Sequence, residues 1–378
     1  MNKNPFILIV ILLSIFILNM ERLSQPRVNV YGWYGIISRE ILSNFEKETG
    51  IKVVYDVYDN NDSLEAKLLA TNSGYDIVFP SFIPYAARQL NMGAYQKIDM
   101  KYVPNIKNIS GSITDNYKKS GGDIDYLIPI LWGTTGIAYD ANVLSKIFPN
   151  EKIDSYDVLL NPEKIKKLAK YGVSFPEEYI DIFLQTNIYL NQGTLDNRRD
   201  IKSINQYIDH FKLVREYIKK FSSSTMINDL ISGEVCIAIG SSDNAWRAMR
   251  SGKYVNKDIR YVIPKNAGIL WVDCVGIPQK APNKENAYKF LNYLLRPDVA
   301  AKITNYSGIL LNIPESTNLY NKEITNDSEI CPMDNDVISK LIMGTPNKNL
   351  SNTKYDKLAT RAWSQIKMGI FTHIEADE

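Results

Sequence analysis

From residue 27 onward, apolar runs of strand length alternate with segments whose apolar residues recur at helical spacing. Residues 27–33, 51–58 and 75–81 read as strands, and residues 38–50 and 62–74 between them read as helices. The order strand, helix, strand, helix, strand predicts a parallel sheet whose strands are joined by right-handed crossovers.

Turn and capping residues mark the boundaries of these elements. Gly50 favours the end of the first helix, and Asp62 or Ser63 is suited to cap the start of the second. Pro80 stops the third strand, because proline has no N–H group for a strand ladder.

A second α/β pattern fills the rest of the chain. Residues 131–140 carry small residues between strand-like ends, which suits a strand that crosses from one half of the molecule to the other. Residues 234–239 read as a buried strand, and residues 259–281 read as two strands about a turn. Helical spacing recurs at 157–172, 176–193, 203–221 and 283–308, the last of which is broken near Pro297.

The chain is long enough for about two domains. It has 378 residues, and a domain commonly has about 100–200 residues. Its net charge is +2, with 44 basic and 42 acidic residues, so no basic excess indicates a nucleic-acid surface. We therefore expect an α/β protein of two domains that does not bind nucleic acid.

The N-terminus has a composition of its own. A lysine precedes an almost unbroken apolar run over residues 5–18, and Glu21 and Arg22 end it. A positive start before an apolar run is typical of a secretory signal, whereas a full membrane span needs about 20 apolar residues. We expect residues 1–25 to direct export to the periplasm, as a signal peptide or as an uncleaved N-terminal membrane anchor.

Cysteine and histidine are scarce. Cys236, Cys274 and Cys331 show no C-x-x-C spacing, and two histidines are too few for a structural zinc site or a histidine-based triad. We expect buried thiols without a chemical role, with one disulfide as the alternative in an oxidising compartment. We expect no metal and no cofactor.

Candidate ligand groups follow the predicted strands. Ligands of open α/β sheets bind at the carboxyl ends of the strands. Trp33 ends the first strand and Ser81 ends the third, so both side chains belong to one rim of the sheet. Trp33, on its glycine-flanked turn, is therefore a candidate wall for a ligand.

Asp273 stands inside an apolar run, two residues after Trp271. Residues two apart on a strand share a face, and a buried carboxylate requires a partner. A cation satisfies both side chains, because the carboxylate and the indole face each attract it.

Acidic residues also mark two helix starts. Glu178 and Asp181 lie near the start of the predicted helix at 176–193, and Asp243 and Asn244 lie in the polar turn of "IGSSDN". A structural role is the alternative for each, because a helix dipole favours acids at its N-terminus and Asp and Asn are common turn residues. No nucleophile, phosphate-binding or metal motif accompanies them, so we do not expect an enzyme.

Longer stretches match one known family in order along the chain. They begin with "YGWYGIISREILSNFEKETGIKVVYDVYDNNDSLEAKLLATNSGYDIVFPS" and continue with "WGTTGIAYD", "INDLISGEVCIAIG", "WVDCVGIP" and "AYKFLNYLLRPDVA". The chain thereby resembles bacterial putrescine/spermidine-binding proteins, the extracytoplasmic receptors of polyamine ABC transporters. It is most similar to their putrescine-type branch.

The resemblance implies a two-lobed, type II periplasmic-binding-protein clamshell. Lobe 1 would comprise residues 26–134 and 272–318, and lobe 2 residues 135–271 and 319–378, with two crossovers between them. A polyamine would lie between the lobes, its methylenes against aromatic side chains and its ammonium groups on carboxylates. Closure would present the monomeric receptor to a membrane ABC permease.

Matching motifs carry the family's ligand contacts onto this chain. Trp33 matches the first-turn tryptophan, Ser81 the serine of the third strand's turn, and Trp271 with Asp273 the aromatic-x-Asp after the second crossover. The ligand-binding residues expected in all are Trp33, Tyr34, Ser81, Glu178, Asp181, Ser241, Asp243, Asn244, Trp271 and Asp273.

Four pocket positions depart from the family pattern. They are Ile36 and Ile309 in place of tyrosines, Ser241 in place of a tryptophan and Asn244 in place of an aspartate. Tyr34, Tyr306 and Asp243 are neighbours that can compensate in part. Because an anchor for one ammonium group is lost, the alternatives to putrescine are another organic cation or an amino-acid-like ligand. A sensor or adaptor without transport is the other alternative.

Overall fold

The computed structural model describes residues 25–375 except residues 59, 71–72, 110, 197, 266–267, 333 and 345–352. The expected signal peptide or anchor at 1–25 lies, but for its last residue, outside the described residues. Within the described part of the chain, no helix combines the length and the apolar character that a bilayer crossing needs.

The first five elements follow the predicted order. They are β1 (Arg27–Trp33), α2 (Arg39–Thr49), β2 (Lys52–Tyr58), α3 (Asn61–Leu69) and β3 (Ile77–Val78). β1 lies between β2 and β3 and is parallel to both, so the predicted parallel arrangement is confirmed for this unit.

Capping residues explain where the two helices begin and end. The Ser38 hydroxyl caps α2, and Gly50 ends it with a φ of 72°, a left-handed conformation that glycine adopts without steric cost. The predicted cap of the next helix was wrong. Asn60, rather than Asp62 or Ser63, caps α3, because its side chain accepts a hydrogen bond from the Ser63 N–H at 2.9 Å.

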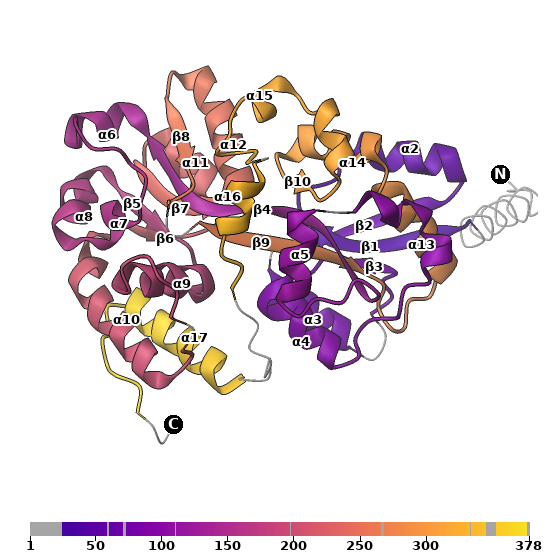
Figure 1. The fold of residues 1–378 in the computed structure, drawn as a ribbon, viewed down its shortest axis with the longest axis horizontal. Coiled ribbons are helices and arrows are strands. Elements are labelled where there is room, and N and C mark those ends of the chain that lie inside the picture. Colours follow the sequence, from indigo (N-terminus) through magenta and orange to yellow (C-terminus); the bar gives the residue numbers. More distant parts are fainter. Residues whose placement is uncertain are drawn as a thin grey trace, which may run out of the picture.

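Two long strands, β4 (Leu127–Asp140) and β9 (Ile269–Gly276), join the two halves of the molecule. They pair antiparallel in a ten-stranded sheet of order β2-β1-β3-β9-β4-β7-β5-β6, in which β8 and β10 also pair with β4. Figure 1 shows them crossing the centre, between a half with β1–β3, here called the first lobe, and a half with β5–β7, the second lobe. The α/β fold with two crossovers is confirmed, and the residue limits of the lobes stay a prediction.

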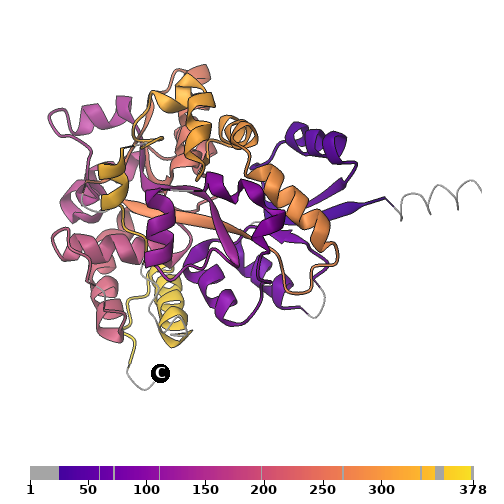
Figure 2. The same cartoon turned by 45° about the vertical axis from the view of Figure 1, so that its right-hand side comes forward.

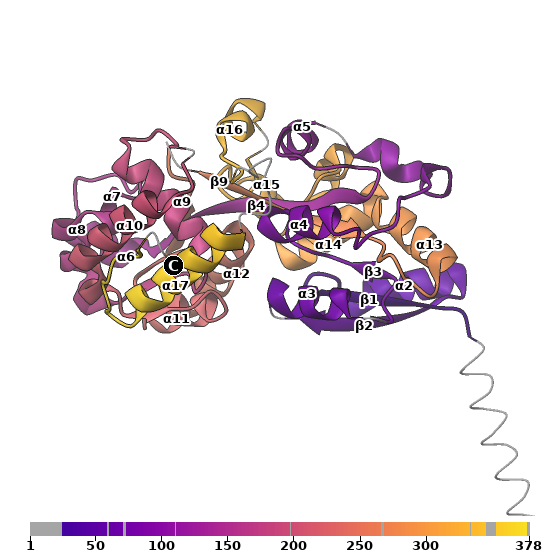
Figure 3. The same ribbon diagram turned by 90° about the horizontal axis from the view of Figure 1, so that it is seen from below.

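The remaining elements cover the two lobes (Figures 2 and 3). The other strands are β5 (Val173–Phe175), β6 (Lys220–Phe221), β7 (Ile237–Ser241), β8 (Ile259–Val262) and β10 (Leu310–Leu311). The other helices are α4 (Ala87–Asn91), α5 (Ser112–Lys119), α6 (Ala141–Ile147), α7 (Asp157–Leu160), α8 (Pro162–Leu168), α9 (Tyr179–Leu190), α10 (Ile201–Val214), α11 (Met226–Ser232), α12 (Ser242–Gly252), α13 (Lys284–Leu294), α14 (Pro297–Ser307), α15 (Lys322–Thr325), α16 (Asn335–Lys340) and α17 (Thr353–Lys367).

Proline decides where two of the predicted helices break. The expected break near Pro297 is confirmed, since α13 ends at Leu294 and α14 begins at Pro297. The single helix expected at 157–172 was wrong. It divides into α7 and α8 because Pro162 occupies the first turn of a new helix that Asn161 caps.

Each lobe has an apolar core with aromatic contacts at its centre. In the first lobe, the rings of Phe45 and Phe290 meet edge-on with centroids 5.0 Å apart. In the second lobe, Trp363 of α17 packs on Phe211 of α10 at 5.1 Å, which ties the C-terminal segment to this lobe. Cys236, Cys274 and Cys331 are buried free thiols, so the alternative of a disulfide is not realised.

The buried Asp76 side chain links distant segments of the first lobe by hydrogen bonds. Its carboxylate is fully buried and accepts hydrogen bonds from the Asn29 N–H at 2.7 Å and the Asn283 N–H at 2.6 Å. The Asn283 amide donates a third bond at 3.0 Å. One side chain thus links β1 to the residue that precedes α13, which is more than two hundred positions further along the chain.

We expect Asp76→Ala to destabilise the protein by about 2–4 kcal/mol, because it leaves buried N–H donors without an acceptor. Urea unfolding followed by circular dichroism measures this change. Asp125→Ala is the matched control, since Asp125 is 44% exposed beside Lys97 and its loss should change stability by less than about 0.5 kcal/mol. Equal effects of the two substitutions would contradict the assigned role of Asp76.

Candidate functional site

The turn after β1 is shaped by close packing around its glycines. A Cβ atom on Gly32 would lie 2.4 Å from the Tyr55 hydroxyl, so only glycine leaves room for that ring. The Tyr55 hydroxyl in turn donates a hydrogen bond to the Trp33 carbonyl at 3.0 Å. Trp33 packs against Tyr58 with ring centroids 4.5 Å apart, which holds the indole at the end of the strand.

Ser81 and Asp273 meet where the first lobe joins β9. They form an isolated antiparallel bridge, and the neighbouring Cys274 N–H donates to the Pro80 carbonyl at 2.9 Å. Asn61 fixes Ser81 on its other side, accepting from its N–H and donating to its hydroxyl oxygen, both at 3.0 Å. The structure therefore brings together two site residues, Ser81 and Asp273, that were predicted separately.

The Asp273 carboxylate is buried at this junction. Its pKa is raised to about 7, mainly because burial disfavours the charged form and in part because of the nearby Asp243 charge, while the Ser81 and Trp33 side chains oppose the shift. Tyr58 and Cys274 also lie near this charge. The pKa of each is raised, mainly by burial and in addition by the Asp273 charge. Within the described ranges, no positively charged group is among the causes of the raised pKa of Asp273.

Trp271 lies on the same face of the crossing strands as Asp273. In the register of β4 and β9, Asp273 is opposite Leu131 and Trp271 is opposite Gly133. A Cβ atom on Gly133 would lie 2.3 Å from the Trp271 ring, so the indole lies flat where only glycine leaves space. Asp273 and Trp271 therefore form a continuous row, as predicted for residues two apart on a strand.

Asp181 extends this row into the second lobe. The Thr135 hydroxyl, two residues beyond Gly133 on β4, donates a hydrogen bond to its carboxylate at 2.7 Å. Burial raises the pKa of Asp181, Thr135 opposes the shift, and the Glu178 charge adds to it. With about 3.3 Å per strand residue, Leu131 and Thr135 place the two carboxylate positions roughly 13 Å apart along β4.

Glu178 lies at the mouth between the lobes. It precedes α9 without capping it, and it accepts a hydrogen bond from the Ser223 hydroxyl at 3.3 Å. The pKa of Tyr85 in the first lobe is raised mainly by burial and by the Asp62 charge, and the Glu178 charge makes a smaller contribution. The two lobes therefore approach each other at this edge.

The start of α12 closes the second-lobe side. Ser241 ends β7 opposite Thr135, and the Ser242 hydroxyl accepts a hydrogen bond from the Thr134 N–H at 3.2 Å. Asp243 is buried and forms an ion pair with Arg247 at 2.5 Å. Asn244, the last predicted residue of this turn, is half-buried on α12.

Some predicted compensating aromatics do not join this group. Tyr34 is 77% exposed and Tyr306 is 51% exposed, so neither is among the buried side chains around Asp273. Ile36 and Ile309 are buried in the apolar core of the first lobe. Their exposure gives no support to the suggestion that Tyr34 and Tyr306 replace two pocket tyrosines, which stays a prediction.

Sequence reasoning missed several residues that shape the site. They are Tyr58, Asn61, Gly133, Thr135, Ser242 and Arg247. Tyr58 and Asn61 follow the second strand, so the rule that identified Trp33 and Ser81 could also have found them. The others depend on the pairing register of β4 and on the helix that begins after β7, which no local pattern reveals.

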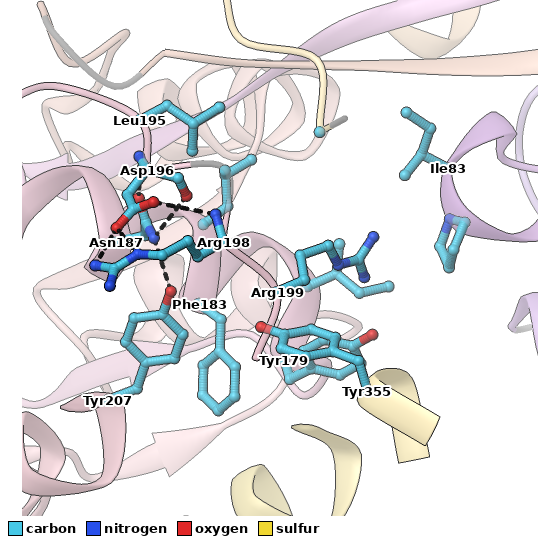
Figure 4. Close-up of a pocket in the computed structure, with 14 residues that line it drawn as sticks. Ile83, Tyr179, Phe183, Asn187, Leu195, Asp196, Arg198, Arg199, Tyr207 and Tyr355 are labelled. Carbon is cyan, nitrogen blue, oxygen red and sulfur yellow. Dashed lines mark hydrogen bonds and ion pairs between the residues drawn. The ribbon is translucent and has the colours of Figure 1, made fainter. Parts of the chain in front are cut away.

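A pocket beside α9 is lined by residues other than those of this row (Figure 4). Tyr179, Phe183 and Tyr207 line it, together with Arg198 and Arg199. Its guanidinium groups are already paired, Arg198 with Asp196 and Arg199 with Asp356 at 2.6 Å. Asp181 and Asp273, whose pKa shifts owe nothing to a cation among the described residues, are the stronger candidate for a ligand site.

The chemistry of the row is that of a cation-binding site. A half-buried carboxylate, Asp181, and a buried one, Asp273, both have raised pKa values and lie on either side of an indole, and a cationic ligand would stabilise their charged forms. In the part of the chain that the structure describes, no three His, Cys, Asp or Glu side chains are grouped as metal ligands.

Comparison with known proteins agrees with this geometry. A family model described as a bacterial extracellular solute-binding protein matches residues 40–332. The chain is 37% identical over 346 residues to the putrescine-binding periplasmic protein SpuD of Pseudomonas aeruginosa, covering 90% of this chain and 92% of SpuD. It is 35% identical over 348 residues to the putrescine-binding periplasmic protein PotF of Escherichia coli, covering 91% and 92%.

A solved structure shows the same architecture. The spermidine/putrescine ABC transporter substrate-binding protein PotD of Streptococcus pneumoniae superposes with a TM-score of 0.76. The match covers 91% of this chain and 99% of that one, at 24% sequence identity. At this identity, the likeness establishes the fold alone.

We expect Asp273→Asn to stabilise the ligand-free protein above pH 7. The pKa of about 7 lies above the ordinary 3.8, so the folded protein binds a proton that the unfolded chain releases, and stability falls as the pH rises between these values. At about 1.4 kcal/mol per pKa unit, the penalty at pH 8 is a few kcal/mol. Thermal melting at pH 5 and pH 8 measures it.

Asp298→Asn is the control for this measurement. Arg296 lowers the pKa of Asp298, so this substitution should give no gain at pH 8. A stability difference between Asp273→Asn and wild type that is the same at both pH values would show that the Asp273 carboxylate is not desolvated as described.

Proposed function

The chain belongs to the bacterial extracellular solute-binding proteins, and on this basis we propose that it captures a polyamine-class amine between its lobes for a membrane ABC permease. The observation that carries the proposal is the buried Asp273 carboxylate, which lies beside Trp33 and Trp271 and which no cation of the described residues balances. An alkylammonium group supplies that cation, and its methylenes suit the indole faces.

The energies fit a ligand that binds tightly yet leaves again. One charge-assisted hydrogen bond to Asp273 contributes about 1.5–3 kcal/mol, and cation–indole contact adds about 0.5–2 kcal/mol. Two such ends give about 4–10 kcal/mol, a range that includes the value of about 8 kcal/mol for a micromolar dissociation constant, and burial of the apolar stem adds to it. A small organic amine with a hydrocarbon stem meets these requirements better than an inorganic cation.

The named relatives support the same ligand class. SpuD and PotF carry putrescine in their names, and a third relative, 30% identical over 353 residues, is a putrescine/agmatine-binding protein of Pseudomonas aeruginosa. The proposed contacts are Trp33, Ser81, Glu178, Asp181, Trp271 and Asp273. Trp33 and Ser81 come from the first lobe, Glu178 and Asp181 come from the second, and Asp273 lies on a strand shared by both.

This distribution explains how capture leads to delivery. A ligand that contacts side chains of both lobes binds the closed arrangement better than an open one, so binding shifts the population toward closure. The closed shape is then the signal that the permease reads. The family consists of binding proteins, and the chain is not an enzyme.

We expect Asp273→Asn to weaken putrescine binding by about tenfold or more, because it removes a charge-assisted contact. Calorimetric titration of refolded, ligand-stripped protein with putrescine, cadaverine, spermidine and agmatine measures this effect. Asp298→Asn, far from the row, should bind as the wild type does. Unchanged affinity in Asp273→Asn would show that this carboxylate does not contact the ligand.

The affinity of the wild type should fall as the pH drops below about 7. Binding requires the ionised carboxylate of Asp273, whose pKa is about 7 without ligand, whereas alkylamines stay protonated throughout this range. The dissociation constant should rise by up to about tenfold per pH unit between pH 7 and pH 5. Asp273→Asn should show no such slope, and an identical slope in both proteins would assign the proton to another group.

A further inference from the structure

The ion pair of Asp243 and Arg247 has no counterpart elsewhere in the row of site residues. The two side chains are one turn apart on α12, with Arg247 Nη2 2.5 Å from the Asp243 carboxylate. The Asp243 side chain is only 8% exposed and that of Arg247 is 30% exposed. A buried carboxylate of the cleft is therefore already neutralised by the protein's own cation.

Arg247 lies against the ligand-facing turn of the other lobe. A Cβ atom on Gly35, two residues after Trp33, would lie 3.6 Å from Arg247 Nη1. Asp243 is also close enough to Asp273 that its charge contributes to the raised pKa of Asp273. The pair thus lies on α12, with Arg247 beside the turn after Trp33 and with the Asp243 charge within reach of Asp273.

Hydrogen-bond donors without acceptors collect at this end. Among the residues that the structure describes, none accepts a hydrogen bond from Arg247 Nη1. The Trp271 indole N–H is buried and likewise has no partner there. A Cβ atom on Gly133 would lie 2.3 Å from the Trp271 ring and 2.7 Å from the Ser242 hydroxyl, so this indole borders the start of α12.

We propose that Arg247 decides which amines the cleft accepts, by occupying Asp243 and presenting a fixed cation to the far end of the ligand. The favoured ligand carries one ammonium group, held by Asp273, and an oxygen acceptor at its other end, as an amino alcohol or an amino acid of similar length does. This inference rests on the proposed function, in which Asp273 holds an ammonium group.

The physical reason is a difference in charge at one end of the ligand. A second ammonium group near α12 would meet the guanidinium and find the Asp243 carboxylate already bonded, so it would be repelled and poorly solvated. A hydroxyl or carboxylate oxygen at the same place accepts hydrogen bonds from Arg247 and from the Trp271 indole.

The test compares putrescine with aminobutanol, which has the same carbon chain and one hydroxyl in place of an ammonium group. Calorimetric titration at pH 8 should show that the wild type binds aminobutanol more tightly than putrescine. Arg247→Gln frees Asp243 and removes the cation, so the ratio of the two dissociation constants should shift toward putrescine by about tenfold or more.

Three further variants separate charge from structure. Arg247→Lys keeps the cation and should keep the preference of the wild type. The double variant Asp243→Asn with Arg247→Gln lacks the freed carboxylate, so it should lose the gain for putrescine. Arg250→Gln is the matched control on the same helix, because Arg250 packs over Trp246, outside the site residues, and should leave the ratio unchanged.

The outcomes distinguish this inference from the proposed function. If putrescine binds the wild type through Asp273 but Arg247→Gln leaves the ratio unchanged, the inference is overturned and the proposed function stands. If neither amine binds the wild type or Arg250→Gln, the proposed function itself fails. Because a change in lobe closure would alter both affinities together, the ratio reports the charge of the far end alone.

Discussion

Burial of the Asp273 carboxylate is the constraint on which the rest of the cleft depends. A charged group on a strand inside a sheet loses its hydrating water. Among the described residues, only the Ser81 and Trp33 side chains stabilise the charge in place of water, and no cation does. The folded protein therefore carries an unfavourable charge that a cationic ligand can stabilise. The buried charge of Asp273 destabilises the ligand-free protein. Binding of a cationic ligand removes this destabilisation, which favours cations over other ligands.

The two strands shared by both lobes, β4 and β9, hold the site residues rigidly. β4 is buried along nearly its whole length, and it carries Gly133 under Trp271 and Thr135 beside Asp181. Side chains on the crossing strands thus stay fixed relative to each other, while Trp33 and Glu178 lie in different lobes. A site on rigid strands with walls on two lobes can hold its charges in place and still close around a ligand.

The second-lobe end shows how one fold can change its ligand. The chain shares its family with receptors named for putrescine, yet its own Arg247 neutralises Asp243, a carboxylate whose charge acts on Asp273. Such a pair on the first two turns of α12 leaves the backbone unchanged and alters the field at one end of the cleft. Specificity in a scaffold of this kind is therefore set by a few charges rather than by its architecture.

The sequence by itself determined the α/β alternation, the helix break at Pro297 and the rim position of Trp33 and Ser81. These follow from local periodicity, proline chemistry and the rule that ligands bind at the ends of strands. The pairing of Asp273 and Trp271 was also local, because residues two apart on a strand share a face.

Only the tertiary structure decided which distant groups meet. The placing of Thr135 on Asp181 and of Gly133 under Trp271 depends on the register of β4, which is set by packing across the whole sheet. The engagement of Asp243 by Arg247 and the exposure of Tyr34 depend on side-chain directions at two turns. The charge environment, burial and distances of a side chain depend on which residues surround it in space, and the pattern of residues along the chain does not specify those neighbours.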